Sequence, residues 1–164
     1  MATEPDDLDR KILAILLRNA TISKSAIAER IGIAQSAVSE RVKKLKESGI
    51  IQRYETRLSP GGVGAGLLAY IFITERKPTG GVNTGERLAL VTGVEEVHKI
   101  AGDDCFLVKI RAKDTEDLGR ILDDEVGPIE TVAGTRTTIV LRTVKEDAPL
   151  GGIPMFKESG ASQA

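Results

Sequence analysis

The segment from Ser23 to Gly49 limits the possible folds more than any other stretch of the sequence. Ser23 is a good N-cap for one helix and Gly32 a good end for it, while a second helix is predicted over residues 35–48, up to Gly49. The gap between them, "GIAQ", holds about four residues, too few for an antiparallel hairpin of long helices. The spacing instead predicts a helix-turn-helix.

Flanking elements complete a small domain around this pair. A helix over "LDRKILAILLRN" is predicted to start after Asp6 or Asp7, either of which can cap it. Behind the pair, "IIQRYETRLS" alternates apolar and polar residues and predicts a short strand pair, a β wing. Helical spacing predicts that the following side chains face one core: Leu8, Ile12, Ile15, Leu16, Ile27, Val38, Val42 and Leu45.

Positive charge gathers around the helix-turn-helix. Residues 18–57 hold 9 Lys and Arg against 4 Asp and Glu, although the whole chain has a net charge of −1. In a winged helix-turn-helix the second motif helix enters the major groove, where Gln suits adenine, Ser suits several bases, and Lys and Arg meet phosphates. The sequence therefore predicts a surface for double-stranded DNA. Its candidate residues are Lys24, Ser25, Gln35, Ser36, Ser39, Glu40, Lys43, Lys44, Lys46, Arg53 and Arg57.

The lysines and Glu40 of this set have alternative interpretations. Lysines on an isolated exposed helix are usually ordinary solvated surface, but here three features coincide: the motif spacing, the local charge and the basic wing. Glu40 either accepts a hydrogen bond from a cytosine amine or pairs with Lys43 or Lys44.

Composition excludes several other classes of protein. The single cysteine, Cys105, allows no internal disulfide, and with only one histidine, His98, the chain lacks the ligands of a Cys/His zinc site. A Cys-His nucleophilic pair is disfavoured because no third orienting group is evident. No apolar run reaches the roughly 18 residues of a membrane span, and "MATEPDDLD" does not resemble a signal peptide. We expect a cytoplasmic protein that needs no metal or cofactor.

A Pro/Gly-rich break, "SPGGVGAG", separates this domain from one with a different order of elements. Strands are predicted over residues 67–74, 94–101, 105–112 and 135–144, and helices over 83–93 and 114–126. This order is the ferredoxin-like βαββαβ pattern, whose bare sheet face invites a partner subunit. The fold class is α+β, divided into a winged helix-turn-helix domain at 1–58, a hinge at 59–66, the βαββαβ domain at 67–146 and a flexible tail at 147–164.

Residues 7 to about 146 resemble the leucine-responsive regulator (Lrp/AsnC) family of transcription factors. The stretch from "DLDRKILAILLRN" to "ERVKKLKESGII" is similar to the family's amino-terminal signature, and "HKIAGDDCFLVKIRA" and "TRTTIVLRTVK" resemble its ligand-sensing domain. The resemblance implies a homodimer that often assembles into tetramers or octamers, with a small effector, commonly an amino acid, bound between subunits.

The resemblance also implies where the effector lies. Asp103 or Asp104 would accept from an ammonium group, while backbone amides and a Thr hydroxyl would donate to a carboxylate. Alternatively, "GDD" only shapes a strand turn. Many members have Asp-Tyr where this chain has Cys105-Phe106, and a Ser cap where it has Ala34. The implied effector residues are Ala101, Gly102, Asp103, Asp104, Cys105, Phe106, Gly134, Thr135 and Thr137.

Two other functions compete with an effector-modulated regulator. One is an effector-independent architectural protein that wraps DNA as an oligomer. The other is an enzyme on the same scaffold, as in the sirohaem decarboxylases, which resemble the family. Such chemistry favours several basic or histidine groups in a large cavity, and His98 is the only histidine. We therefore expect no enzymatic activity.

Overall fold

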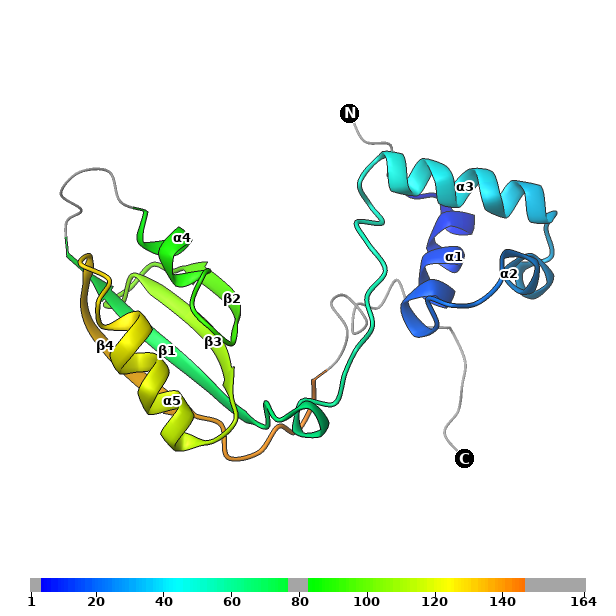
Figure 1. Ribbon diagram of the computed structural model, residues 1–164. Coiled ribbons are helices and arrows are strands. Elements are labelled where there is room, and N and C mark those ends of the chain that lie inside the picture. Colours follow the sequence, from blue (N-terminus) through cyan, green and yellow to red (C-terminus); the bar gives the residue numbers. More distant parts are fainter. Residues whose placement is uncertain (1–3, 77–82, 147–164) are drawn as a thin grey trace. The chain divides into compact units, whose positions relative to one another are not determined.

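The computed structural model describes residues 4–76 and 83–146. The chain divides between Thr56 and Arg57 into a helical unit and a unit built on a sheet, which extends to Val144 (Figure 1). The tail that the sequence predicts at 147–164 lies outside the described residues. Within the described part, no helix is both long and apolar enough to cross a membrane.

The first two helices begin at the caps that the sequence predicts. Helix α1 spans Asp7–Arg18, and the side chain of Asp6 accepts from the backbone N–H of Asp9 at 2.8 Å, in a reciprocal capping box. Helix α2 spans Lys24–Ile31, capped by Ser23, and ends at Gly32 with φ 72°. That left-handed conformation favours glycine, which is why the chain turns there.

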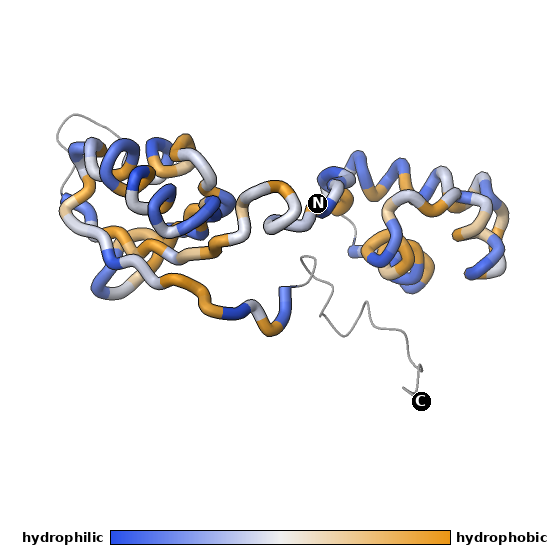
Figure 2. The backbone as a smooth tube through the Cα atoms, turned by 60° about the horizontal axis from the view of Figure 1, so that its bottom comes forward, coloured by the Kyte–Doolittle hydropathy of each residue, from blue (hydrophilic) through white to orange (hydrophobic). Residues whose placement is uncertain are grey.

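Helix α3, Gln35–Glu47, differs from the other two at its start. Its N-cap is Ala34, which has the extended backbone of a cap but no side chain that can accept a hydrogen bond. Gly49 follows the helix with φ 75°. The three helices enclose one core, and their hydrophilic and hydrophobic residues alternate along the chain as amphipathic helices require (Figure 2). Its buried members are Ile12, Ile15, Ile27, Ala28, Val38 and Val42; Leu45 is buried too, while Leu8 and Leu16 are half-buried.

The predicted β wing is wrong for this chain. Residues 52–58 adopt no regular secondary structure, and no strand precedes Leu67 in the described segment 4–66. All side chains from Gln52 to Ser59 are exposed. Alternation predicts a strand only where a neighbouring element buries every second side chain, and this segment has no such neighbour within the helical unit.

The second unit has the predicted βαββαβ order, and its sheet order β2-β3-β1-β4 with antiparallel neighbours is ferredoxin-like. Helices α4 and α5 cover the same face of the sheet (Figure 1). The elements are β1 (Leu67–Glu75), α4 (Thr84–Leu88), β2 (Val94–Lys99), β3 (Phe106–Ala112), α5 (Thr115–Ile121) and β4 (Val132–Ile139).

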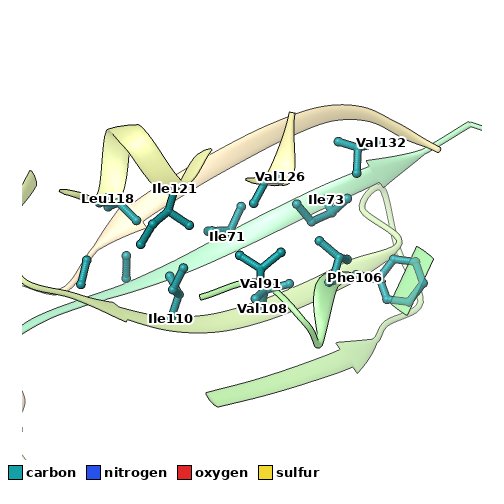
Figure 3. Close-up of a cluster of buried hydrophobic side chains, with 13 residues drawn as sticks. Ile71, Ile73, Val91, Phe106, Val108, Ile110, Leu118, Ile121, Val126 and Val132 are labelled. Atoms are coloured by element: carbon teal, nitrogen blue, oxygen red, sulfur yellow. The ribbon is translucent and has the colours of Figure 1, made fainter. Parts of the chain in front are cut away.

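Every second residue of β3, beginning with Phe106, is buried, as expected for a strand covered on one face. The core between the sheet and the helices is built mainly from Ile, Val and Leu side chains (Figure 3). Its fully covered members include Ile71, Ile73, Leu88, Val108, Ile110, Ile121 and Val126.

Three predicted elements have an end that differs by three residues or more from the structure. Helix α4 stops at Leu88 rather than residue 93, because the chain passes into turns in which Val91 N–H donates to Leu88 C=O at 3.2 Å. Strand β4 runs over Val132–Ile139 rather than 135–144, since its pairing with β1 ends at Ala69–Ile139. Helix α5 itself ends at Ile121, and a wider helical turn continues it to Val126.

Candidate DNA-binding surface and effector site

The packing of α3 decides which of its side chains face solvent. Val38, Val42 and Leu45 are at most 5% exposed and turn one side of the helix into the core. The polar residues consequently occupy the outer side. Exposed there are Gln35, Ser36, Glu40, Lys43, Lys44 and Lys46, with Ser39 half-buried.

Acidic side chains accompany the lysines along this outer side. Lys44 Nζ lies 2.9 Å from Glu40 Oε1, and Lys43 Nζ lies 3.7 Å from Glu47 Oε1. The hydrogen bond from Lys44, followed by its charge, lowers the pKa of Glu40 below the ordinary carboxyl value. Lys46 Nζ lies 4.7 Å from the centre of the Tyr54 ring. Glu40 therefore pairs with Lys44, one of the two roles that the sequence leaves open.

Arg41 is a basic residue of α3 that sequence reasoning missed. Its guanidinium donates to Asp6 at 2.7 Å and to Asp9 at 2.9 Å, so it fastens α3 to the start of α1. These bonds, first that of Asp6 and then that of Asp9, raise the pKa of Arg41. The sequence does not reveal this pairing, because Arg41 lies more than thirty positions from both aspartates.

The remaining predicted DNA contacts come from other segments. Lys24 opens α2, and the Ser25 hydroxyl lies 2.9 Å from that of Ser23. Arg53 forms an ion pair with Glu55 on the irregular segment after α3. Arg57 belongs to the sheet unit, whereas the other candidates belong to the helical unit.

The predicted effector loop joins β2 to β3. Ile100 N–H donates to Cys105 C=O at 2.9 Å and closes the loop over Ala101–Asp104. Gly102 has φ 146°, a conformation that L side chains rarely adopt, although a Cβ there would meet open space. Asp103 is exposed, and Cys105 is half-buried with its N–H bonded to Ile73 C=O.

The other implied effector residues divide between the two faces of the sheet. Phe106 is 6% exposed and lies in the core, so its ring does not face a site outside the core. Thr135 and Thr137 stand opposite Ile73 and Ile71 and share the helix-covered side of the sheet. Gly134 stands opposite Thr74, on the uncovered side.

Sequence reasoning also missed Arg136. Its Nη2 lies 2.8 Å from Asp104 Oδ2, and its guanidinium lies over the Phe72 ring at 3.9 Å from the ring centre. Arg136 stands opposite Phe72 in the β1–β4 ladder, so the pair crosses β1 on the uncovered face. Only the strand register brings these residues together.

Charged residues of β2 and β3 flank the same uncovered face. Lys109 Nζ lies 3.2 Å from both Glu95 and Glu96, and Arg111 Nε lies 2.9 Å from Glu95. His98 Nε2 lies 3.0 Å from Glu96 Oε2, and this contact is the main reason that the pKa of Glu96 is lowered.

Both units match known families. The family model "Winged helix-turn-helix DNA-binding" matches residues 5–52, and the model "Lrp/AsnC ligand binding domain" matches residues 68–150. The HTH-type transcriptional regulator FL11 of Pyrococcus furiosus is 37% identical over 145 residues, which cover 88% of this chain and 95% of that protein.

Solved structures agree with these matches. AsnC of Escherichia coli superimposes with a TM-score of 0.83 at 25% identity, over 89% of this chain and 98% of that one. The feast or famine regulatory protein of M. tuberculosis, solved with L-methionine, gives a TM-score of 0.79 at 31% identity, over 87% and 95% of the two chains. With its two domains in this order, the chain belongs to the Lrp/AsnC family of transcriptional regulators.

Proposed function

We propose that this regulator binds double-stranded DNA through the outer side of α3, as a homo-oligomer whose assembly responds to a free amino acid. The single observation that carries the DNA contact is the division of α3 into two sides. Val38, Val42 and Leu45 lie in the core. The exposed polar side chains of the helix are Gln35, Ser36, Glu40, Lys43, Lys44 and Lys46. The buried side fixes the helix in the domain, and the polar side remains accessible to DNA.

The order of residues along α3 fits the geometry of a major groove. Its 13 residues form a helix about 20 Å long, and the groove is about 12 Å wide. Gln35, Ser36 and Ser39 occupy the first half, which meets base edges in this motif, whereas the lysines occupy the second half. We assign base contacts to the first half and phosphate contacts to the second.

The two ion pairs along α3 do not oppose this assignment. Lys43, Lys44 and their glutamate partners are all more than 60% exposed, so water and salt already weaken both pairs. DNA carries a dense row of phosphates, and each phosphate that an ammonium group neutralises releases condensed counterions, which favours the contact with DNA. Lys43 and Lys44 can therefore exchange a glutamate for a phosphate.

The test is a titration of a duplex from the region upstream of the protein's own gene. Changing Lys43 and Lys44 together to Ala removes two phosphate contacts, so the plot of log affinity against log salt should become shallower by about 1.8. The matched control changes Lys99 and Lys113, two exposed lysines of the sheet unit, to Ala and should leave the slope unchanged. Equal slopes for the wild type and both double variants would show that Lys43 and Lys44 do not contact DNA.

The effector site is proposed at the loop between β2 and β3. Asp103 presents an exposed carboxylate beside Gly102, and Asp104 lies on the uncovered face of the sheet, where it meets Arg136. An amino acid needs acceptors for its ammonium group and donors for its carboxylate. A relative 31% identical to this chain was solved with L-methionine, which supports an amino acid as the class of effector.

The uncovered face supports assembly. Tyr70, Phe72 and Leu107 are half-buried aromatic and aliphatic side chains at the middle of a sheet that α4 and α5 cover only on the other side. Antiparallel sheets commonly pack one such face against another element. We infer that a second copy of the chain packs there. The molar mass from light scattering should be that of a dimer or a larger species. The Phe72→Glu variant should have a molar mass closer to that of the monomer.

We infer no catalytic role for the chain. His98 is exposed and engaged with Glu96, and Cys105 lies in the closing turn of the effector loop. Within the described residues no contact joins Cys105 to His98, so the two do not form an activated nucleophile pair. Binding of a coloured tetrapyrrole by the purified protein would contradict this inference.

A further inference from the structure

Lys46 differs from the other two lysines of α3 in the partner that it meets. Lys43 and Lys44 each face a glutamate of the same helix, whereas Lys46 Nζ lies 4.7 Å from the centre of the Tyr54 ring. In the described part of the chain Lys46 forms no ion pair. Because a tyrosine ring is neutral at pH 7, no carboxylate offsets the positive charge of this lysine.

Lys46 also lies at the end of the row of side chains that we assign to DNA. Steps of three or four residues place side chains on one face of a helix. Such steps connect Gln35, Ser39, Lys43 and Lys46. Lys46 is therefore the last basic group that this row presents to a duplex, in the half of α3 that we assign to phosphates.

Tyr54 comes from the irregular segment that follows α3. Ile51 N–H donates to Leu45 C=O at 2.9 Å, and Ile51 packs against the helical core. Beyond it, residues 52–56 form no backbone–backbone hydrogen bond within the described part of the chain, and Tyr54 is 46% exposed. The contact with Lys46 therefore joins this segment to the last turn of α3.

An ammonium group that lies over a ring can still bind a phosphate. It carries three N–H donors, and the ring meets it from one side only. A long side chain loses rotamer freedom when it is fixed at an interface, but the ring already restricts Lys46. Lys43 and Lys44, in contrast, must first leave their glutamates. The Tyr54 ring thus lowers the entropy that Lys46 loses on meeting DNA.

We propose that Tyr54 is a positioning residue for DNA binding, and that its ring holds the Lys46 ammonium group in place for a backbone phosphate. This inference rests on the proposed DNA contact of α3 and adds a residue from outside that helix. Phosphate contacts carry no sequence information directly, so Tyr54 should affect the affinity for every duplex. Its effect should also depend on the presence of Lys46.

The test is a double-mutant cycle in which the purified protein is titrated with a duplex at several salt concentrations. Lys46→Ala removes one phosphate contact and should make the plot of log affinity against log salt shallower by about 0.9. Tyr54→Leu removes the ring and should weaken binding about two- to fivefold. Tyr54→Phe keeps the ring and should bind like the wild type. In the Lys46→Ala background, Tyr54→Leu should have no further effect.

Two controls accompany the cycle. Lys99→Ala also removes an exposed lysine that lies over a ring, that of Phe106 at 5.7 Å, but it does so in the sheet unit and should leave the slope unchanged. Thermal melts of all variants show whether the fold is intact. Lys46 and Tyr54 are exposed, so their variants should melt at the temperature of the wild type.

Three outcomes would contradict the inference. If Tyr54→Leu weakens binding equally with and without Lys46, Tyr54 does not act through that lysine. If Tyr54→Phe weakens binding as much as Tyr54→Leu, the hydroxyl group and not the ring is responsible. If Lys46→Ala keeps the wild-type slope, this inference fails and the proposed DNA binding stands. A wild-type protein that binds no duplex at low salt would instead refute the proposed function, and this inference with it.

Discussion

Arg41 of α3 donates a hydrogen bond to Asp6, the N-cap of α1, across 2.7 Å. The same carboxylate accepts from the Asp9 N–H, so one side chain both starts α1 and fixes the helix that we assign to DNA. Arg41 is half-buried and faces α1, and it is consequently not counted among the DNA contacts. A disturbance at Asp6 should therefore reach α3.

The first prediction concerns acid. The Asp9 N–H, and then Arg41, lower the pKa of Asp6 in the folded protein below its ordinary value. A lowered folded pKa gives stability that is present above the unfolded value of about 3.9 and is lost as pH falls through the folded one. Stability followed by helical circular dichroism in urea should thus fall below about pH 4. Asp6→Asn should flatten that fall.

The second prediction uses the missing cap of α3. Ala34 already has φ −67° and ψ 143°, the backbone of an N-cap, but no acceptor. Ala34→Ser should therefore raise the free energy of unfolding of the helical unit by about 0.5–2 kcal/mol. Ala34→Val adds bulk without an acceptor and serves as control. Equal stability of the two variants in urea would show that the free amides of α3 are satisfied by water.

The start of α1 and both ends of α2 could be predicted because their causes are local. Asp6, Ser23 and Gly32 act within one turn of their own positions, and all three predicted ends are confirmed. The βαββαβ order is confirmed as well. In β3 every second side chain is buried, so the neighbouring elements support the strand that its sequence predicts. The end of β4 was wrong because it depends on where β1 stops pairing.

The missed parts depend on register and tertiary contact. Arg136 meets Asp104 only because β4 places it opposite Phe72, and no spacing in the sequence encodes that match. The wing was wrong for a related reason. The segment after α3 has the alternation of a strand, but every side chain from Gln52 to Ser59 is exposed, so nothing in the helical unit selects the extended form.

A third prediction tests the core of the sheet unit. Ile71 lies on β1 between β3 and β4 and is 1% exposed (Figure 3). Ile71→Ala should lower the free energy of unfolding by about 2–5 kcal/mol, because it removes buried methyl groups and leaves a cavity. Leu90→Ala removes an apolar side chain that is 81% exposed and should change stability by less than about 0.5 kcal/mol in denaturant.

A fourth prediction separates two costs of replacing a glycine that has a positive φ: the strain of the backbone conformation and the steric overlap of the added Cβ. Gly93 has φ 76°, and a Cβ there would overlap the carbonyl oxygen of Arg111, whose own N–H donates to Gly93 C=O at 2.9 Å. Gly64 has φ 77° and open space around its Cβ position. Gly64→Ala should cost about 1–2 kcal/mol from backbone conformation alone. Gly93→Ala should cost clearly more in the same thermal melt, and equal costs would rule out the overlap.

The fifth prediction distinguishes two roles for Glu40. Its carboxylate holds Lys44 at 2.9 Å and would lie near phosphates if α3 enters a groove. Glu40→Gln should therefore tighten binding to any duplex and steepen the plot of log affinity against log salt, by about 0.9 if Lys44 gains one phosphate. Glu116→Gln, the same charge change on α5, is the control.

The alternative role predicts the opposite pattern of sequence dependence. If Glu40 accepts from a cytosine amine, Glu40→Gln should weaken binding to the preferred duplex by about 1–3 kcal/mol and leave non-specific duplexes bound as well or better. A set of duplexes that differ at one base pair separates the two cases. If Glu40→Gln binds every duplex of the set more tightly, Glu40 acts through its charge, because its repulsion from the phosphates does not depend on the base. A loss confined to one position assigns it to base recognition.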